Sequence, residues 1–330
     1  TNTILLIWFE RKVVAGMQSR VGPDRAGPFG ILQTLADAIK LLLKEQILPL
    51  KADRAMYLLA PLIALVPSFL IFMIIPLGPD ITVEWQNALY TIPLVGADLN
   101  VGVLYFLALS SIAVYSVVLA GWSSGSKYPL LGGVRASAQM ISYEAAMGLA
   151  LVPVILYSGS LSLVDIVNSQ SGNLSSSIPI LNTIVSFIPK WNIFPQFVAF
   201  GIFFIAAVAE VNRAPFDLVE AEQELVGGFH TEYSGFRFAM FFLAEYINMF
   251  NMCAITATFF LGGWLGPTFE GILPPIFSVI MPIIWLGVKT FLLLFVFVWI
   301  RATLPRLRYD QLMELGWKRM IPLSLVWLIL

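Results

Sequence analysis

The sequence has little charge, a single cysteine and a single histidine. Only 12% of its 330 residues are charged and 58% are apolar, whereas soluble domains carry about 25% charged residues. This composition excludes a soluble globular protein. The 19 basic residues nearly balance the 20 acidic ones, so the chain lacks the basic excess that attracts nucleic acid. Cys253 is the only cysteine and His230 the only histidine. This excludes a disulfide framework, a zinc cluster and an iron–sulfur centre held by cysteines of this chain.

Long apolar runs fill most of the chain. About 20 mostly apolar residues form a helix that crosses a bilayer, and six runs reach that length: 56–77, 99–122, 136–157, 193–211, 238–264 and 276–300. Two shorter runs, 3–9 and 320–330, resemble membrane helices cut short by the ends of the sequence. Backbone amides in lipid must be paired within their own segment. The sequence therefore predicts an all-α polytopic membrane bundle of about eight helices, the first and last truncated, as a single membrane domain over residues 1–330.

Basic residues gather in alternate loops between these helices. All Lys and Arg residues except Lys190 and Lys289 lie in the first, third, fifth and seventh loops. Basic loops stay on the cytoplasmic or matrix side of a membrane. We therefore expect these inner loops to share that side and both termini to lie on the other, outer side. The alternation also supports the number of helices, since one helix more or fewer would disturb it.

The first inner loop, residues 10–55, contains an amphipathic segment at 30–45. Its polar residues recur at helical spacing among apolar ones, which is typical of a helix lying in the membrane interface. The polar stripe consists of Gln33, Asp37, Lys40 and Lys44. Such a helix either caps the bundle or borders a doorway for a lipid-like ligand. A turn rich in Gly and Pro precedes it and presents the guanidinium groups of Arg20 and Arg25, where lipid phosphates can bind.

The fifth inner loop, within residues 209–237, is acidic. Six carboxylates fall within 23 consecutive residues, and Arg213 is the only base among them. The Ala-Pro pair after Arg213 should end the preceding helix, and the spacing of Asp217 and Glu220 predicts the start of a short helix. The cluster is either a solvated acidic face or, because crowded carboxylates raise one another's pKa, a set of groups that pass protons near neutral pH. The lone His230 is interpreted as a structural residue.

Four ionisable residues lie inside the predicted membrane helices, where a charge is costly and usually functional. They are Glu144, Glu210, Glu245 and Lys289. A helical rise of about 1.5 Å per residue places all four roughly 10–16 Å from the inner surface, in the inner half of the membrane. The four residues predict either a polar path for protons from the acidic loop towards the bilayer midplane, or a Glu–Lys pair that only fixes helix packing.

Five blocks of the sequence resemble, in the same order, conserved blocks of one family. They are ERKVVAGMQSRVGPDRAGPFGILQTLADAIKLLLKE (10–45), GWSSGSKYPLLGGVRASAQMISYE (121–144), AEVNRAPFDLVEAEQELVGGFHTEYSG (209–235), FFLAEYINM (241–249) and PRLRYDQLMELGWKRMIPLSL (305–325). The family is the membrane-embedded H subunit of bacterial NADH:quinone oxidoreductase, the counterpart of subunit 1 of mitochondrial complex I. The resemblance covers essentially the whole chain.

The resemblance implies a membrane subunit that forms the quinone entrance and chamber wall and starts the charged path that couples quinone reduction to proton translocation. On this interpretation the chain belongs to an oxidoreductase but is not catalytic alone. Quinone is the substrate, FMN and iron–sulfur clusters belong to partner subunits, and this chain holds no cofactor or metal. The expected partners are the other membrane-arm and hydrophilic-arm subunits and the lipid bilayer, without nucleic acid.

The resemblance also implies roles for individual residues. Those that match positions near the quinone passage are Arg20, Arg25, Asp37 and Phe216. Those that match the charged loop and the proton path are Glu144, Glu210, Asp217, Glu220, Glu222, Glu224 and Glu245. Lys289 joins the proton path as the remaining charge inside a membrane helix.

Two alternatives remain open at this point, a related energy-converting hydrogenase and a stand-alone secondary transporter. The amphipathic segment and the block NRAPFDLVEAE (212–222) favour the quinone enzyme over the hydrogenase. The sequence has no clear internal repeat of the kind that marks many transporters. The variant GFHTEYSG (228–235) favours the bacterial inner membrane over the mitochondrial inner membrane.

Overall fold

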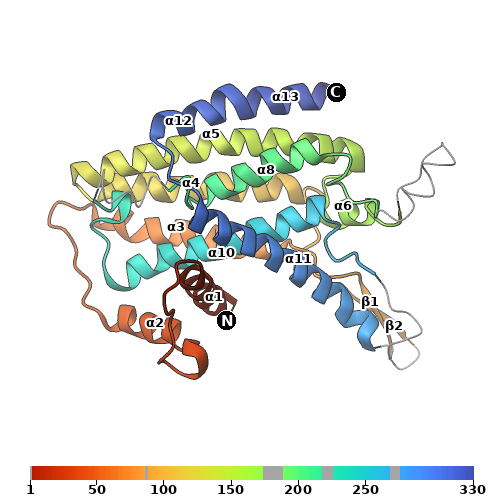
Figure 1. Ribbon diagram of the computed structural model, residues 1–330, viewed down its shortest axis with the longest axis horizontal. Helices are drawn as coiled ribbons and strands as arrows, with labels where there is room; N and C mark the ends of the chain where they lie inside the picture. Colours follow the sequence, from red (N-terminus) through yellow and green to blue (C-terminus); the bar gives the residue numbers. More distant parts are fainter. Residues whose placement is uncertain (1, 86–87, 174–188, 218–225, 268–275) are drawn as a thin grey trace.

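The computed structural model describes residues 2–85, 88–173, 189–217, 226–267 and 276–330 (Figure 1). Within these described ranges, five helices are long and apolar enough to cross a membrane: α3 (Arg54–Met73), α4 (Gly102–Ser123), α5 (Lys127–Ser158), α10 (Gly235–Phe260) and α11 (Ile276–Thr303). The apolar helix α8 (Phe197–Glu210) is shorter. The two end runs are also helical: 3–9 lies within α1 (Asn2–Met17), and most of 320–330 forms α13 (Ile321–Ile329), which directly follows α12 (Tyr309–Glu314) and η3 (Leu315–Met320). The all-α prediction is confirmed.

The helices form a bundle whose long axis is horizontal in Figure 1. Helices α3, α4, α5, α8 and α10 pack together at its centre, α13 lies along α5 and α8, and α1 and α11 lie beside α10. Large side chains such as Phe106, Tyr143, Phe203 and Phe259 are fully buried in the core. Close packing of such side chains fixes the position of each helix against its neighbours.

The end of the bundle that carries the predicted inner loops, called the inner end below, holds the amphipathic helix α2 (Gln33–Leu43), which follows the short 3₁₀ helix η1 (Pro28–Gly30). The helix falls within the predicted segment 30–45. Its apolar side chains Leu35, Ile39 and Leu42 are exposed, so they do not pack into the hydrophobic core of the bundle.

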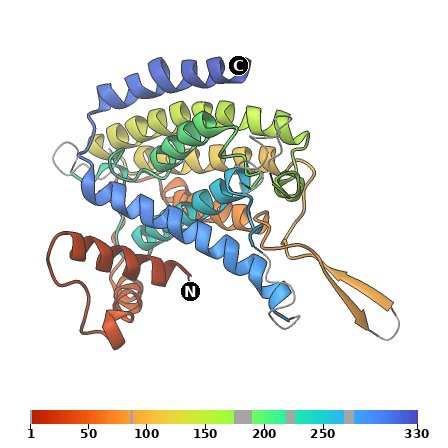
Figure 2. The same ribbon diagram turned by 45° about the vertical axis from the view of Figure 1, so that its right-hand side comes forward.

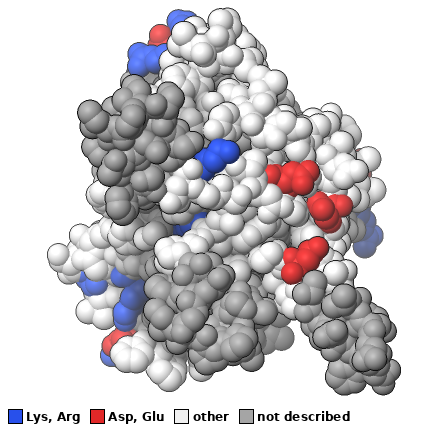
Figure 3. Space-filling model, turned by 90° about the vertical axis from the view of Figure 1, so that its right-hand side faces the viewer, with Lys and Arg blue, Asp and Glu red and all other residues white. Residues whose placement is uncertain are grey.

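The outer end carries a feature that the apolar runs do not predict. Strands β1 (Ile81–Trp85) and β2 (Ala88–Ile92) form an antiparallel hairpin that projects from the bundle (Figure 2). The short helix α6 (Leu163–Ser169) lies at the same end, and Ser162 caps it by accepting a hydrogen bond from the Asp165 amide. Figure 3 faces this end, where most of the described atoms belong to uncharged side chains.

Helix α5 is longer than expected, and this corrects the predicted third inner loop. The helix begins at Lys127 and therefore includes residues such as Arg135 that the hydropathy pattern assigns to a loop. A helix can continue beyond the lipid when other parts of the protein pack against the extended segment. Here Gly132 lies against η2 (Gly228–His230), and a Cβ atom on Gly132 would come within 2.7 Å of the Gly228 Cα atom.

We predict that Gly132→Ala destabilises the protein by about 1–3 kcal/mol, because the added methyl group overpacks the contact between α5 and η2. Gly148→Ala is the matched control, since Gly148 lies on the same helix and a Cβ atom there meets nothing within 4 Å. The apparent melting temperature of the protein extracted from its membrane measures both. Equal melting temperatures for the two variants would contradict the tight contact.

Candidate functional site

A tight turn follows α8 and carries two of the predicted site residues. Helix α8 ends at Glu210, and a cis peptide bond joins Ala214 to Pro215. Gln139 of α5 is fully buried, and its Nε2 atom donates hydrogen bonds to the carbonyls of Ala209 at 2.9 Å and Phe216 at 2.8 Å. One amide side chain thus ties both ends of the turn to α5.

The far side of the turn is fixed by the segment after α11. The Leu307 amide donates to the Pro215 carbonyl at 3.1 Å, and Arg306 pairs with Asp217 at 3.3 Å. The ring of Phe216 is buried against Tyr143, with 5.5 Å between the ring centroids. Phe216, which the resemblance places near the quinone passage, therefore lies in the protein interior on this face of α5.

Arg213, in the middle of the turn, is the centre of a buried ion cluster. Its Nε atom lies 2.8 Å from a Glu245 carboxylate oxygen, and its Nη1 atom donates to Glu10 at 3.3 Å. Glu10 of α1 also accepts a hydrogen bond from Arg301 of α11. The Arg213 guanidinium stacks on the Tyr246 ring at 4.3 Å. Two carboxylates and two guanidinium groups balance one another, which the buried pair of Arg213 and Glu10 requires, while the Arg301 side chain is 36% exposed.

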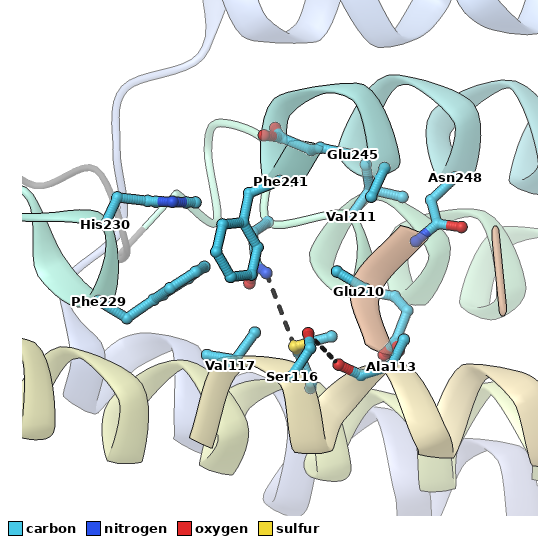
Figure 4. A pocket seen from close by; sticks show the side chains of 14 residues that line it. Ala113, Ser116, Val117, Glu210, Val211, Phe229, His230, Phe241, Glu245 and Asn248 are labelled. Atoms are coloured by element: carbon cyan, nitrogen blue, oxygen red, sulfur yellow. Dashed lines mark hydrogen bonds between the residues drawn. The ribbon is translucent and has the colours of Figure 1, made fainter. Parts of the chain in front are cut away.

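A small cavity of about 70 Å³ lies inside the bundle next to this cluster (Figure 4). Glu210, Glu245 and Asn248 line it with Ser116, while His230 and Phe229 lie at one end. A buried water needs about 10–15 Å³ and several polar partners. The cavity is therefore large and polar enough to hold several waters.

Two adjacent serines of α4 each hold one of the carboxylates of Glu210 and Glu144. Ser110 donates to Glu210 at 2.9 Å, and Ser111 donates to Glu144. Glu210 is 6% exposed and Glu144 is half-buried. Each of the two carboxylates thus accepts a hydrogen bond from a neighbouring residue of α4. The structure thus brings together three of the predicted path residues, Glu144, Glu210 and Glu245.

His230 is enclosed by aromatic rings at the inner end of the cavity. Its ring lies 3.8 Å from that of Phe229 and 5.3 Å from that of Phe241, measured between centroids. Burial lowers the pKa of His230 to about 3, because the apolar surroundings disfavour the imidazolium ion. The histidine is therefore neutral at physiological pH.

A larger polar groove of about 810 Å³ opens beside the ion cluster. It lies between α1, the turn at residues 18–23, α10 and the end of α11. Arg20 lines this groove, and so do Glu10, Arg301 and Tyr246. Asp37 does not line it but pairs at 2.6 Å with Arg11, which does. Arg25 is not among the residues that line the groove.

Lys289 lies away from the other predicted path residues. Its ammonium group donates to the carbonyls of Leu261 at 2.6 Å, Gly263 at 3.0 Å and Leu265, beyond the outer end of α10. It also lies 4.3 Å from the Trp191 ring centroid. The structure therefore does not place this amine in the inner half of the membrane, because the long side chain reaches outwards to unpaired helix-end carbonyls.

The remaining predicted residues, Glu220, Glu222 and Glu224, lie outside the described residues, as does the expected acidic helix. Sequence reasoning missed Glu10 and Arg301 as members of the ion cluster. Glu10 carried a usable signal, since it directly follows the apolar run at residues 3–9. For Arg301 the sequence contains no signal that distinguishes it from the other basic residues of its loop.

Comparison with known proteins agrees with these features. A family model described as NADH dehydrogenase matches residues 1–330. The chain belongs to this family. A relative from Frankia casuarinae, named as the H subunit of NADH-quinone oxidoreductase, is 52% identical over 99% of this chain and 68% of its own length.

Two further relatives carry the same name followed by the numeral 2. The one from Syntrophobacter fumaroxidans is 51% identical over 97% of this chain and 87% of its own length. The one from Geobacter sulfurreducens is 52% identical over 99% of this chain and 89% of its own length. The similarity of this NADH dehydrogenase family member to them therefore extends over its whole helical bundle.

We predict that the neutral His230 makes the protein less stable in acid. The unfolded chain binds a proton near pH 6.5 and the folded chain only near pH 3, so stability is present above pH 6.5 and is lost as the pH falls from 6.5 towards 3. Between pH 7 and pH 5 the loss is about 2 kcal/mol. His230→Phe should remove this part of the pH dependence. Identical shifts in melting temperature between pH 7 and pH 5 for both proteins would contradict a neutral His230.

Proposed function

We propose that the chain is the membrane-embedded H subunit of an NADH:quinone oxidoreductase. In this role it forms part of the wall of the quinone passage and begins the charged path to the proton-translocating membrane arm. It acts as one subunit of the oxidoreductase and is not catalytic alone. Quinone is then the substrate, FMN and iron–sulfur clusters belong to partner subunits, and the site is the bacterial inner membrane. The names of the relatives support the subunit assignment.

One observation carries the finer part of this proposal. The Arg213 ion cluster has members in the lining of both the polar groove and the internal cavity. Glu10 and Tyr246 face the groove, Glu245 faces the cavity, and Arg213 contacts all three. A change of charge in the groove therefore changes the electrostatic potential in the cavity through the Arg213 guanidinium, because charge pairs interact strongly where water is scarce.

The groove suits a quinone headgroup better than an inorganic ion. Its lining combines guanidinium groups, which can donate hydrogen bonds to carbonyl oxygens, with the apolar side chains of Val14 and Ala15 and the Phe242 ring. Reduction of the quinone consumes protons near these residues. We propose that Arg213 then shifts its balance between Glu10 and Glu245, and that Glu245, Glu210 and Glu144 pass the change inwards as proton transfers across the cavity.

We expect Glu144→Gln to block coupled proton transfer while the complex still assembles. The amide keeps the size of the carboxyl group but cannot carry a proton, and losing one acid–base group costs about a hundredfold in its transfer step. Proton uptake driven by NADH in sealed vesicles measures coupling, and NADH oxidation by ferricyanide measures assembly.

Glu314→Gln is the matched control, because Glu314 is half-exposed and contacts Lys318 on the surface. It should leave both activities unchanged. Full coupled proton uptake by the Glu144→Gln protein would remove Glu144 from the path.

We also expect Ala302→Trp to obstruct the groove, which Ala302 lines at the end of α11. The apparent KM for quinone should rise about tenfold or more, with ferricyanide reduction unchanged. Thr303→Trp is the control, since Thr303 is exposed on the next position of the same helix and does not line the groove. Equal quinone kinetics for the two variants would show that quinone does not use this groove.

A further inference from the structure

The outer end of α10 is closed by hydrogen-bond donors from elsewhere in the chain. The last carbonyls of a helix find no amide partner within it, and here each carbonyl at positions 258–261 accepts a hydrogen bond from a different donor. The acceptors are the carbonyls of Thr258, Phe259, Phe260 and Leu261, and their donors, in the same order, are Gln170 Nε2, Asn192 Nδ2, the Ile193 amide and Lys289 Nζ. Lys289, which comes from α11, is the one charged donor of these four.

Beyond α10 the chain turns around the Lys289 ammonium group. Gly262 and Gly263 have φ angles of 72° and 50°, a conformation that glycine adopts without a steric penalty. The turn directs the carbonyls of three alternate residues, 261, 263 and 265, onto one nitrogen atom. Nζ lies 2.6 Å from the Leu261 carbonyl and 3.0 Å from the Gly263 carbonyl, and it also donates to the Leu265 carbonyl. We call these three acceptors the carbonyl cage.

The carbonyl cage is shielded from water. The Trp191 ring also faces the ammonium group, with its centroid 4.3 Å from Nζ, and Lys289 is only 5% exposed. Among the described residues, the partners of this charge are three carbonyls and one ring face, without a carboxylate. Carbonyl oxygens can replace the hydration shell of a cation, and the ring adds a cation–π attraction. The cage therefore has the composition of a site for a monovalent cation.

The number of acceptors in the carbonyl cage indicates the protonation state of Lys289. An ammonium group has three N–H donors and no acceptor, which matches the three carbonyls. A neutral amine has two donors and a lone pair, so one buried carbonyl would lose its hydrogen bond and face the lone pair, which is costly. A group that relays protons has to release its proton and regain it. The cage stabilises only the protonated form.

We infer that the carbonyl cage is a binding site for a primary ammonium group, which Lys289 fills as a tethered ligand. Lys289 is then a permanent charge that takes no part in proton transfer. The negative end of the α10 dipole strengthens its binding. The cage joins α10 to α11 at the outer side, and the ion cluster links the same two helices nearer the inner side through Glu245 and Arg301. Together the two sites fix the position of α10 along α11.

Chemical rescue tests the carbonyl cage directly. Lys289→Ala removes the side chain beyond Cβ, and the atoms removed are those of n-propylammonium. The variant complex, extracted from its membrane in detergent at pH 7, is melted in equal concentrations of n-propylammonium, tetramethylammonium or potassium chloride. We expect its melting temperature to fall by several degrees in the potassium salt. Propylammonium should restore at least half of the loss, whereas tetramethylammonium, which has no N–H donor, should restore none.

Lys190→Ala is the matched control. Lys190 also lies over an aromatic ring on the outer side, 6.0 Å from the Tyr157 centroid, but it is partly exposed. This variant should keep the wild-type melting temperature in all three salts. An unchanged melting temperature of Lys289→Ala, or equal recovery in the three salts, would overturn the inference.

A second variant, Lys289→Met, keeps the length of the side chain and removes only the ammonium group. It should melt below the wild type and, because the methionine fills the channel to the cage, should not be restored by propylammonium. Protons taken up per NADH oxidised in sealed vesicles should equal the wild-type value. A lower ratio at an unchanged melting temperature would place Lys289 in the proton path and overturn the inference. The melting temperatures do not depend on the proposed function, which proton uptake by the wild type tests separately.

Discussion

The buried guanidinium of Arg213 sets the conditions that the surrounding structure has to meet. A charge removed from water is tolerated only when opposite charges and hydrogen bonds replace its hydration. Glu10, Glu245 and the face of the Tyr246 ring supply that replacement, and they come from α1 and α10. Removing one partner of such a buried pair costs about 3–5 kcal/mol. The ion cluster therefore requires α1, the turn after α8, α10 and α11 to meet in one arrangement.

The same requirement explains the shape of the turn after α8. Arg213 reaches the cluster only because the chain leaves α8 at Glu210 and doubles back, and Gln139 holds both ends of that reversal by two hydrogen bonds. Glu210 remains on the helix and faces the cavity. One short segment thus presents a carboxylate to the interior and a guanidinium to the cluster. This places the groove and the cavity within reach of the same few side chains.

Hydropathy and charge patterns are enough to predict the helices and the place of α2, because lipid leaves the backbone few alternatives. They do not predict the extension of α5 beyond the lipid, since the stabilising contact between Gly132 and η2 is tertiary. They also misplace the charge of Lys289, whose ammonium group lies several bonds from its Cα atom, among the carbonyls beyond α10. A carboxylate inside an apolar helix stands out in the sequence, as at Glu144, Glu210 and Glu245. The pairing of Glu10 with Arg301, in contrast, depends on helix packing.

The hydrogen bond between Arg301 and Glu10 joins residues that are 291 positions apart in the chain. During synthesis α1 is made first, and its carboxylate enters the membrane long before either guanidinium group exists. Until Arg213 and then Arg301 emerge from the ribosome, Glu10 has to stay protonated, remain near the surface or be shielded by an insertion factor. Closure of the cluster therefore requires α1, the turn after α8 and the end of α11 to be present together.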